Sequence, residues 1–274
     1  MTDPVLHRAS TVVPGGVLAF TPVRDARVDG ASDVYRDLDP AELELAMQMS
    51  SVRRGPFVAG RQALRAALRS LDPGLAAAPL LRTARGAPSV PAGATGSISH
   101  KRTRAVALAA PQGDPANETF VGVDLESRPQ QGDALRDIDQ KRGLAARILT
   151  AREFDGIAAL DAAAHREATL LHFAIKEAVY KTIDPFVGRY VRFTEVELAL
   201  LGDTSHGGAQ HGIPQHGIAQ YGIALVTLRL PECAQRAMHV EAAWSLEPEW
   251  IVATAISVSP RAAQSPRPGS ASPG

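Results

Sequence analysis

The chain of 274 residues carries 29 Lys plus Arg against 29 Asp plus Glu, so its formal net charge is 0. At roughly 150 residues per domain this length predicts about two units. With 45% hydrophobic and 21% charged residues, the composition is that of a globular protein with a sizeable core. The neutral balance argues against a nucleic-acid coat or a polybasic membrane binder. The single cysteine, Cys233, excludes an internal disulfide framework and a thiol-rich zinc site.

No apolar stretch approaches the roughly 18–20 residues that a membrane span needs. The N-terminal segment also has no apolar run long enough for the core of a signal peptide. We therefore expect a cytoplasmic protein with no membrane span and no nucleic-acid partner, whose functional surfaces are marked by local clusters of charge.

The first part of the chain has the pattern of helices followed by extended segments. Asp39 as N-cap and Pro40 in the first turn predict a helix start, and Gly55-Pro56 is expected to interrupt this helix. A second helix is predicted over 57–71, where an Asp-Pro-Gly sequence follows. After a turn-rich stretch, SISH and RAVALAA are expected to form short extended segments.

The second part of the chain repeats this order. FVGVDLE is expected to be a strand because apolar residues occupy alternate positions. Helices are predicted over 137–149, 151–160 and 163–182, and a β-hairpin is predicted in HVEAAWSL and EWIVATAISV. Helices followed by a hairpin thus occur twice, which predicts an α+β fold, a pseudo-dimer of two similar halves. The halves are placed at 1–118 and 119–259, followed by a tail at 260–274.

A short tandem repeat, AQHGI, PQHGI and AQYGI, lies in a low-complexity segment at 203–222 that we interpret as a surface insertion. The alternative is a metal-binding tract of His206, His211 and His216, which lacks the thiolate or carboxylate partners of a tight site. From Pro260 onward, 9 of 15 residues are Pro, Gly or Ser, so the tail is expected to be disordered.

The sequence GVDLE places two acids on one side of a strand. Asp124 and Glu126 project together, while Val123 and Leu125 face the other way. Neighbouring carboxylates repel one another, so such a pair stays ionised only where water, a basic side chain or a hard cation offsets its charge. Alone, the pair is also explained as the exposed polar face of an amphipathic strand.

The segment FAIKEAVYK combines charges with apolar neighbours. Glu177 and Lys181 are spaced i, i+4, which by itself is typical of a solvated ion pair on a helix. Ile175 and Val179, however, place apolar surface around these charges. A third carboxylate with two lysines, Lys176 and Lys181, in such a setting indicates a metal ligand or base beside lysines that bind a phosphate-bearing cofactor.

Basic residues in two further segments are candidate phosphate contacts. Arg61 interrupts the apolar stripe between Phe57 and Leu64, which is costly unless an anion meets it there or the side chain extends to the rim. Arg53 and Arg54 lie just upstream, so this corner is expected to be basic.

GSISHKR is the second of these segments. Ser97, Ser99 and His100 can donate hydrogen bonds to phosphate oxygens, and Arg85 in the preceding loop adds charge. A Ser-His hydrolase is not indicated, because no G-x-S-x-G sequence accompanies these residues.

GSISH, GVDLE and FAIKEAVYK, in this order and at these separations, resemble the three signature blocks of 4′-phosphopantetheinyl transferases. More narrowly, they resemble the Sfp-like group and its siderophore-synthesis, enterobactin-type branch. RRGPFVAGRQALRAAL resembles the arginine-containing helix of that branch, and the resemblance covers about 45–200. Ala174 departs from the Ser or Thr that members often carry, Gly55-Pro56 departs in the approach to Arg61, and the QHGI insertion is not part of the pattern.

The resemblance implies an enzyme that transfers the phosphopantetheine arm of coenzyme A to a serine of an acyl, aryl or peptidyl carrier protein. It implies release of adenosine 3′,5′-bisphosphate, a requirement for Mg²⁺, and a pseudo-dimer that binds coenzyme A between its halves. A monomer is then expected, because the two halves already supply both sides of the cleft. About 128–165 is a candidate surface for the carrier protein.

The resemblance also implies roles for single residues. Asp124 and Glu126 resemble the acidic metal pair, and Glu177 resembles the third carboxylate, a metal ligand and base toward the carrier serine. Lys181 resembles the lysine on the pyrophosphate. The expected contacts of the coenzyme A phosphates are Ser99, His100, Arg61, Arg54 and Arg85, with Lys176 and Lys181 beside them; Glu153 stands where some members have another active-site glutamate.

Two alternatives remain at this point. One is another Mg²⁺-dependent phosphoryl or nucleotidyl transferase that shares only the acidic cluster, although the chain has no GxxxxGK[ST] sequence. The other is a non-catalytic module that binds coenzyme A or a carrier protein.

Overall fold

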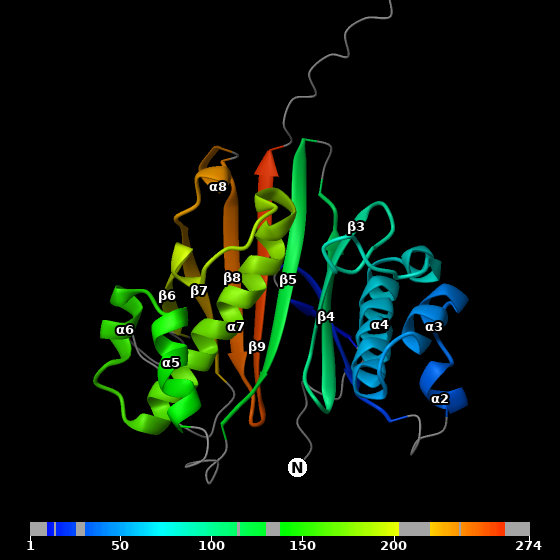
Figure 1. The fold of residues 1–274 in the computed structure, drawn as a ribbon. Coiled ribbons are helices and arrows are strands. Elements are labelled where there is room, and N and C mark those ends of the chain that lie inside the picture. The colour runs from blue at the N-terminus through cyan, green and yellow to red at the C-terminus, as the bar shows by residue number, and fades with distance from the viewer. Residues whose placement is uncertain are drawn as a thin grey trace, which may run out of the picture.

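The computed structural model describes residues 10–13, 15–25, 31–113, 116–129, 138–202, 220–235 and 237–260 (Figure 1). In the N-terminal half, helices lie against one face of an antiparallel sheet of order β1-β2-β4-β3. The elements of this half are β1 (Ser10–Val13), β2 (Gly16–Pro22), α2 (Ala31–Tyr35), α3 (Pro40–Met47), α4 (Ser51–Leu71), a short 3-10 helix (Pro73–Ala77), β3 (Ala94–His100) and β4 (Arg104–Pro111).

The C-terminal half is built around an antiparallel sheet of order β5-β9-β8-β7-β6, against which α7 packs. Its elements are β5 (Asn117–Ser127), α5 (Ile138–Ile148), α6 (Ala151–Ile157), α7 (Ala162–Val187), a 3-10 turn (Phe193–Glu195), β6 (Val196–Gly202), β7 (Gln220–Leu228), α8 (Pro231–Gln235), β8 (His239–Leu246) and β9 (Trp250–Pro260).

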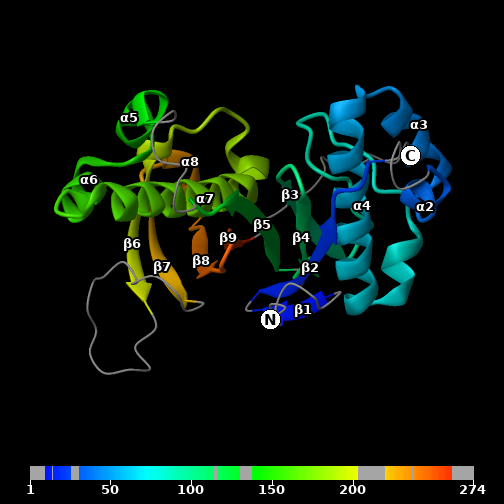
Figure 2. The same cartoon turned by 90° about the horizontal axis from the view of Figure 1, so that it is seen from below.

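The two halves share one topology, which confirms the predicted α+β pseudo-dimer. In each half, the strand before the long helix pairs with the last strand of the half, and that strand pairs with the one before it. Thus β2-β4-β3 corresponds to β5-β9-β8, and α4 corresponds to α7. Figure 2 shows the halves side by side, each with its long helix against its own sheet.

A hydrophobic seam joins the two sheets. Val121, Val123 and Leu125 alternate along β5 and pack against Leu108 and Trp250, among other buried residues of the two sheets. Because side chains alternate across a strand, this packing turns Gly122, Asp124 and Glu126 to the opposite face of β5. The seam therefore determines which face of β5 carries the acids.

The first helix begins as predicted, but the expected interruption at Gly55-Pro56 is wrong. Asp39 accepts a hydrogen bond from the Ala41 amide, and Glu42 completes a capping box. Helix α3 ends at Met47. Helix α4 begins at Ser51 and continues through Pro56. Pro56 lacks the N–H that would bond the Val52 carbonyl, and Val52 is 82% exposed, so water can solvate that carbonyl.

The predicted insertion and tail fall mostly outside the described residues. Residues 203–219 and 261–274 belong to this undescribed part. Gln220 to Gly222, which the sequence analysis placed in the insertion, instead form the start of β7 and pair with β6 and β8. Within the described ranges, no helix is long and apolar enough to cross a membrane.

Candidate active site

The acidic pair lies on β5, in the interior of the protein. Asp124 is 5% exposed and Glu126 is 8% exposed, so the alternative of an exposed polar strand face is wrong. Both carboxylates lie on the face of β5 opposite the apolar seam. Two carboxylates buried this close together require positive partners.

Helix α7 reaches the acids because β5 has a glycine at its centre. A Cβ atom built on Gly122 would lie 1.8 Å from the Ala178 carbonyl oxygen and 3.2 Å from the Thr182 amide nitrogen. The Thr182 hydroxyl donates to the Phe120 carbonyl at 2.6 Å, which ties the helix to the strand. Glycine at this position therefore permits the contact that brings Glu177 and Lys181 to the acidic pair.

Lys181 and a serine from the other half meet at Asp124. The Lys181 ammonium donates to Asp124 Oδ1 at 2.7 Å and to the Val123 carbonyl at 2.8 Å. From β3, the Ser99 hydroxyl donates to the same Oδ1 at 2.7 Å, and Ser97 Oγ accepts from the Val123 amide at 3.1 Å. Asp124 Oδ2 is buried and has no hydrogen-bond partner among the described residues.

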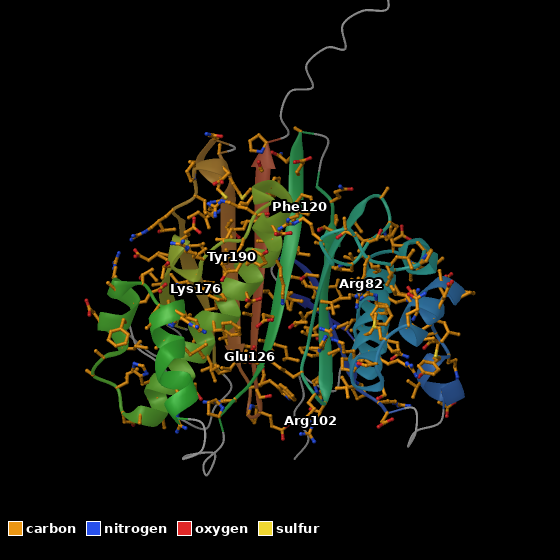
Figure 3. The ribbon with its side chains drawn as sticks, viewed as in Figure 1. Arg82, Arg102, Phe120, Glu126, Lys176 and Tyr190 are labelled. Atoms are coloured by element: carbon orange, nitrogen blue, oxygen red, sulfur yellow. The ribbon has the colours of Figure 1, made fainter. Side chains whose placement is uncertain are left out.

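Glu126 is paired with a lysine that the sequence analysis did not use. Lys101 Nζ lies 2.6 Å from Glu126 Oε1. Burial raises the pKa of Glu126, and the Lys101 charge opposes this shift. Figure 3 shows Glu126 toward one end of β5.

Glu177 is half-buried on the face of α7 near the acids. Burial raises its pKa, and the negative charge of Asp124 raises it further, whereas Lys181 and Lys101 lower it. A carboxylate whose pKa is raised is a better proton acceptor than an ordinary one. The third carboxylate is thus electrostatically coupled to Asp124.

The carboxylates of Asp124, Glu126 and Glu177 are the ligand type that a hard divalent cation prefers, although lysine ammonium groups pair with two of them in this structure. Among the residues that the structure places, no three of His, Cys, Asp or Glu gather closely enough to hold a metal ion. Lys181 and Lys101 instead neutralise Asp124 and Glu126. The buried Oδ2 of Asp124, for which the described residues offer no hydrogen-bond partner, is the kind of ligand that Mg²⁺ prefers.

Beside these acids lies a cleft of about 1130 Å³ to which both halves contribute. Its lining from the C-terminal half includes Tyr180, Lys181 and Asp184. Its lining from the N-terminal half is strongly basic and comprises Arg24, Arg53, Arg54, Arg61, Arg82, Arg85, His100, Lys101 and Arg102 among others. Burial lowers the pKa of His100, and the charges of Lys181 and Lys101 lower it further. The cleft is therefore suited to a polyanionic ligand.

Comparison with known proteins assigns the family. The family model of the 4′-phosphopantetheinyl transferase N-terminal domain matches 41–110. The model of the 4′-phosphopantetheinyl transferase superfamily matches 120–226, so the two together cover more than half of the chain. The chain belongs to the 4′-phosphopantetheinyl transferase superfamily.

A curated relative agrees with this assignment. The 4′-phosphopantetheinyl transferase Svp of Streptomyces mobaraensis is 32% identical over 178 residues. The aligned part is 64% of this chain and 66% of Svp, just under two thirds of the relative's length. The unmatched stretch between the two regions, 111–119, includes the start of β5.

Several arginines that the 4′-phosphopantetheinyl transferase resemblance assigned to phosphates make internal contacts here. The guanidinium of Arg61 donates to the Leu80 and Leu81 carbonyls, each at 2.8 Å, and lies over the Phe57 ring. Burial and Arg82 lower the pKa of Arg61 to about 10. Carbonyls therefore supply the negative partner that we expected from an anion, although Arg61 also lines the cleft.

Arg54 and Arg85 line the cleft and are also held by the protein. Arg54 donates to carbonyls at the end of α3, including that of Met49 at 3.1 Å. Arg85, from the loop before β3, donates to Asp184 Oδ2 at 2.8 Å and to the Gly188 carbonyl at 3.0 Å. The Arg85–Asp184 pair links the N-terminal half to α7.

Replacing Asp184 by Asn should reduce stability in a pH-dependent way. The Arg85 guanidinium lowers the pKa of Asp184 below its ordinary value. The pair therefore stabilises the fold above about pH 4 and loses this effect as the pH falls and the carboxylate is protonated. We expect urea unfolding to show a less stable variant at pH 7 and a much smaller difference at pH 3. An equal difference at both pH values would contradict this account.

Lys176, which the sequence analysis placed among the coenzyme contacts, makes internal contacts in this structure. The side chain is fully buried and donates to Glu153 at 2.6 Å, to the Ile148 carbonyl at 2.8 Å and to the Phe193 carbonyl at 3.1 Å. Burial lowers its pKa. Figure 3 shows Lys176 and the cleft residue Arg82 on opposite sides of the molecule.

Glu153 has a structural environment as well. Its carboxylate accepts from Lys176, from the Thr150 amide at 2.7 Å and from the Leu198 amide at 2.7 Å. These bonds fix α6 and β6 to α7 and leave Glu153 buried away from the cleft. This position, away from the cleft, does not fit the active-site glutamate that the resemblance suggested for Glu153.

The Lys176–Glu153 pair should matter for stability. Removing one partner of a buried ion pair leaves an uncompensated charge and typically costs about 3–5 kcal/mol. We therefore expect Lys176→Met to lower the free energy of unfolding by about this amount, as measured by urea denaturation. Adding Glu153→Gln should recover part of the loss, because it removes the unpaired charge. A Lys176→Met protein as stable as the wild type would contradict the pairing.

Proposed function

We propose that the protein transfers the 4′-phosphopantetheine arm of coenzyme A to a serine of an apo acyl, aryl or peptidyl carrier protein. The observation that supports this most strongly is the arrangement of Asp124, Glu126, Glu177 and Lys181 beside a basic cleft shared by both halves. The products are the holo-carrier and adenosine 3′,5′-bisphosphate.

The cleft carries groups suited to each charged part of coenzyme A. Its arginines and His100 would bind the phosphates, as guanidinium groups match phosphate oxygens in geometry and charge. Lys181 would contact the pyrophosphate and stabilise the negative charge that develops on the leaving oxygen. Ser99 holds Asp124 in place at the same time.

Asp124, Glu126 and Glu177 are the residues that would hold Mg²⁺. Bound there, Mg²⁺ supplies electrostatic stabilisation of the pyrophosphate charge. The carrier serine attacks the β-phosphorus, and the bond between this phosphorus and the bridging oxygen of the pyrophosphate breaks. The bridging oxygen leaves with adenosine 3′,5′-bisphosphate. Glu177 accepts the proton of the serine hydroxyl, which is a poor nucleophile at neutral pH.

Within the family, we propose the Sfp-like group and its enterobactin-type branch. The GSISH, GVDLE and FAIKEAVYK blocks and the arginine-containing helix α4 support this placement. We also propose that the chain acts as a monomer, because the halves supply both walls of the cleft. The carrier is proposed to dock on about 128–165, the region from the end of β5 to the first turn of α7.

A transfer assay tests the proposed function. The protein is incubated with coenzyme A, Mg²⁺ and an apo carrier protein, and the carrier is examined by mass spectrometry. A mass gain of one phosphopantetheine arm, lost when EDTA is added, is the expected result. A non-catalytic module would bind coenzyme A without any mass gain, and a different phosphoryl transferase would add a different group.

A further inference from the structure

Lys101 lies where β3 turns toward β4, and its side chain reaches across to the C-terminal half. Its Nζ is 2.6 Å from Glu126 Oε1, the side chain is 34% exposed, and the residue lines the cleft. The backbone amide of Lys101 donates to the Arg104 carbonyl at 2.8 Å, so the hairpin fixes the backbone here. The side chain beyond it is a flexible stem that ends in a hydrated point charge.

Among the described residues, three lysines pair with carboxylates of the C-terminal half, and they differ in how firmly they are held. Lys176 is fully buried with three acceptors, and Lys181 donates to a carbonyl as well as to Asp124. For Lys101, the contact that the described residues show is the single ion pair with Glu126. A partly exposed pair with one contact adds little to stability. Lys101 is therefore the lysine that can leave its carboxylate most easily.

The oxygen that Lys101 neutralises is one that a divalent cation would need. A cation on the acidic pair would use Glu126 together with the buried Oδ2 of Asp124, which no described residue satisfies with a hydrogen bond. An ammonium and a divalent cation repel one another strongly at such short range in a partly buried site. Cation binding therefore requires the Lys101 ammonium to move away from Glu126.

Because the backbone of Lys101 is fixed at a position that lines the cleft, a displaced ammonium would stay within reach of a ligand bound there. We propose that Lys101 is a further substrate-binding residue: it neutralises Glu126 in the free protein and binds the coenzyme A pyrophosphate in the loaded protein. This inference rests on the proposed function, since it takes the acidic group as the metal site. In this proposal the Lys101 ammonium pairs first with Glu126 and then with the pyrophosphate of coenzyme A.

Metal binding without coenzyme A tests the first part. Lys101→Gln removes the competing ammonium, so the variant should bind Mn²⁺ more tightly than the wild type, on the order of tenfold. Free Mn²⁺ is measured by electron paramagnetic resonance during a titration. Arg69→Gln, an exposed residue near the end of α4, is the control because it makes the same change in net charge outside the cleft.

Coenzyme binding tests the second part. With Ca²⁺ present, Lys101→Gln should bind coenzyme A more weakly, on the order of tenfold, and Lys101→Arg should keep most of the affinity. Dephospho-coenzyme A, which lacks the 3′-phosphate, should show the same loss as coenzyme A. A loss with coenzyme A alone would place Lys101 at the 3′-phosphate and overturn the inference, as would wild-type affinity of Lys101→Gln for both Mn²⁺ and coenzyme A.

The wild-type protein separates this inference from the proposed function. If the wild type transfers the arm and requires Mg²⁺ while Lys101→Gln binds both ligands normally, only the role of Lys101 is wrong. If the wild type neither transfers the arm nor binds Mn²⁺ in the presence of coenzyme A, the proposed function itself fails.

Discussion

Replacing Glu177 by Gln is expected to reduce the turnover number of arm transfer by about 10²–10⁴-fold, the usual contribution of a positioned proton acceptor. Glutamine has nearly the same shape but cannot accept the proton of the carrier serine. Burial and Asp124 raise the pKa of Glu177, which favours this role. Turnover is measured with saturating coenzyme A, Mg²⁺ and apo carrier, and coenzyme A binding is measured separately by calorimetry.

The separation of turnover from binding makes the Glu177 prediction specific. Coenzyme A affinity should change much less than turnover, because the cleft that binds the phosphates is intact in the variant. Glu44→Gln, at an exposed position on α3, makes the same chemical change away from the site and should leave both quantities unchanged. Wild-type turnover of Glu177→Gln would show that another group accepts the proton.

Replacing Gly122 by Ala is expected to disrupt both the fold and the activity. The added Cβ would lie 1.8 Å from the Ala178 carbonyl oxygen, a backbone atom that cannot turn aside. Either α7 or β5 must shift, and overpacking of this kind costs about 1–3 kcal/mol or more. A shift of about 1 Å in catalytic geometry can also lower the rate by about 10²-fold. Urea unfolding and the transfer assay measure the two effects.

A second glycine is the matched control for Gly122. A Cβ on Gly156, in α6, would meet no atom within 4 Å. Because alanine is a better helix former than glycine, Gly156→Ala should stabilise the protein slightly, by about 0.5–1 kcal/mol. Equal behaviour of the two variants would show that the contact between β5 and α7 is looser than described.

The sequence predicted the strand that carries the acids because its pattern is local. Alternating apolar residues over 120–126 identified β5 and placed Asp124 and Glu126 on one face. The start of α3 was also predictable, since Asp39 and Pro40 are adjacent in the chain. The order of helices followed by a hairpin occurs twice in the sequence, and this repetition was enough to predict two similar halves.

Features that depend on contacts between distant segments could not be predicted in the same way. Gly55-Pro56 has the composition of a break, yet the solvent-exposed Val52 allows α4 to continue through Pro56. Gly55 serves a contact instead, because a Cβ there would lie 2.8 Å from the Arg24 carbonyl oxygen. Lys101 was missed because its partner lies in the other half of the chain. Only its position directly after SISH could have drawn attention to it.

Lys176 and Lys181 lie in one motif, FAIKEAVYK, but only Lys181 lines the cleft, and the sequence could not distinguish them. Five residues along a helix turn the side chain by about 140°, so the two lysines leave α7 in different directions. Both sides of α7 are covered, one by β5 and the other by α5. Periodicity therefore indicated burial on both sides, but it could not show which side faces the cleft.

The repeated backbone has a consequence for the number of reaction centres. An internally doubled fold can carry a copy of its site on each repeated strand, yet β2, the counterpart of β5, reads GVLAFTP and contains no acid. The halves therefore differ in charge: Asp124, Glu126 and Glu177 lie in the C-terminal half, whereas the arginines that line the cleft come from the N-terminal half. Under the proposed function, we therefore expect each chain to bind one coenzyme A molecule, despite its twofold architecture.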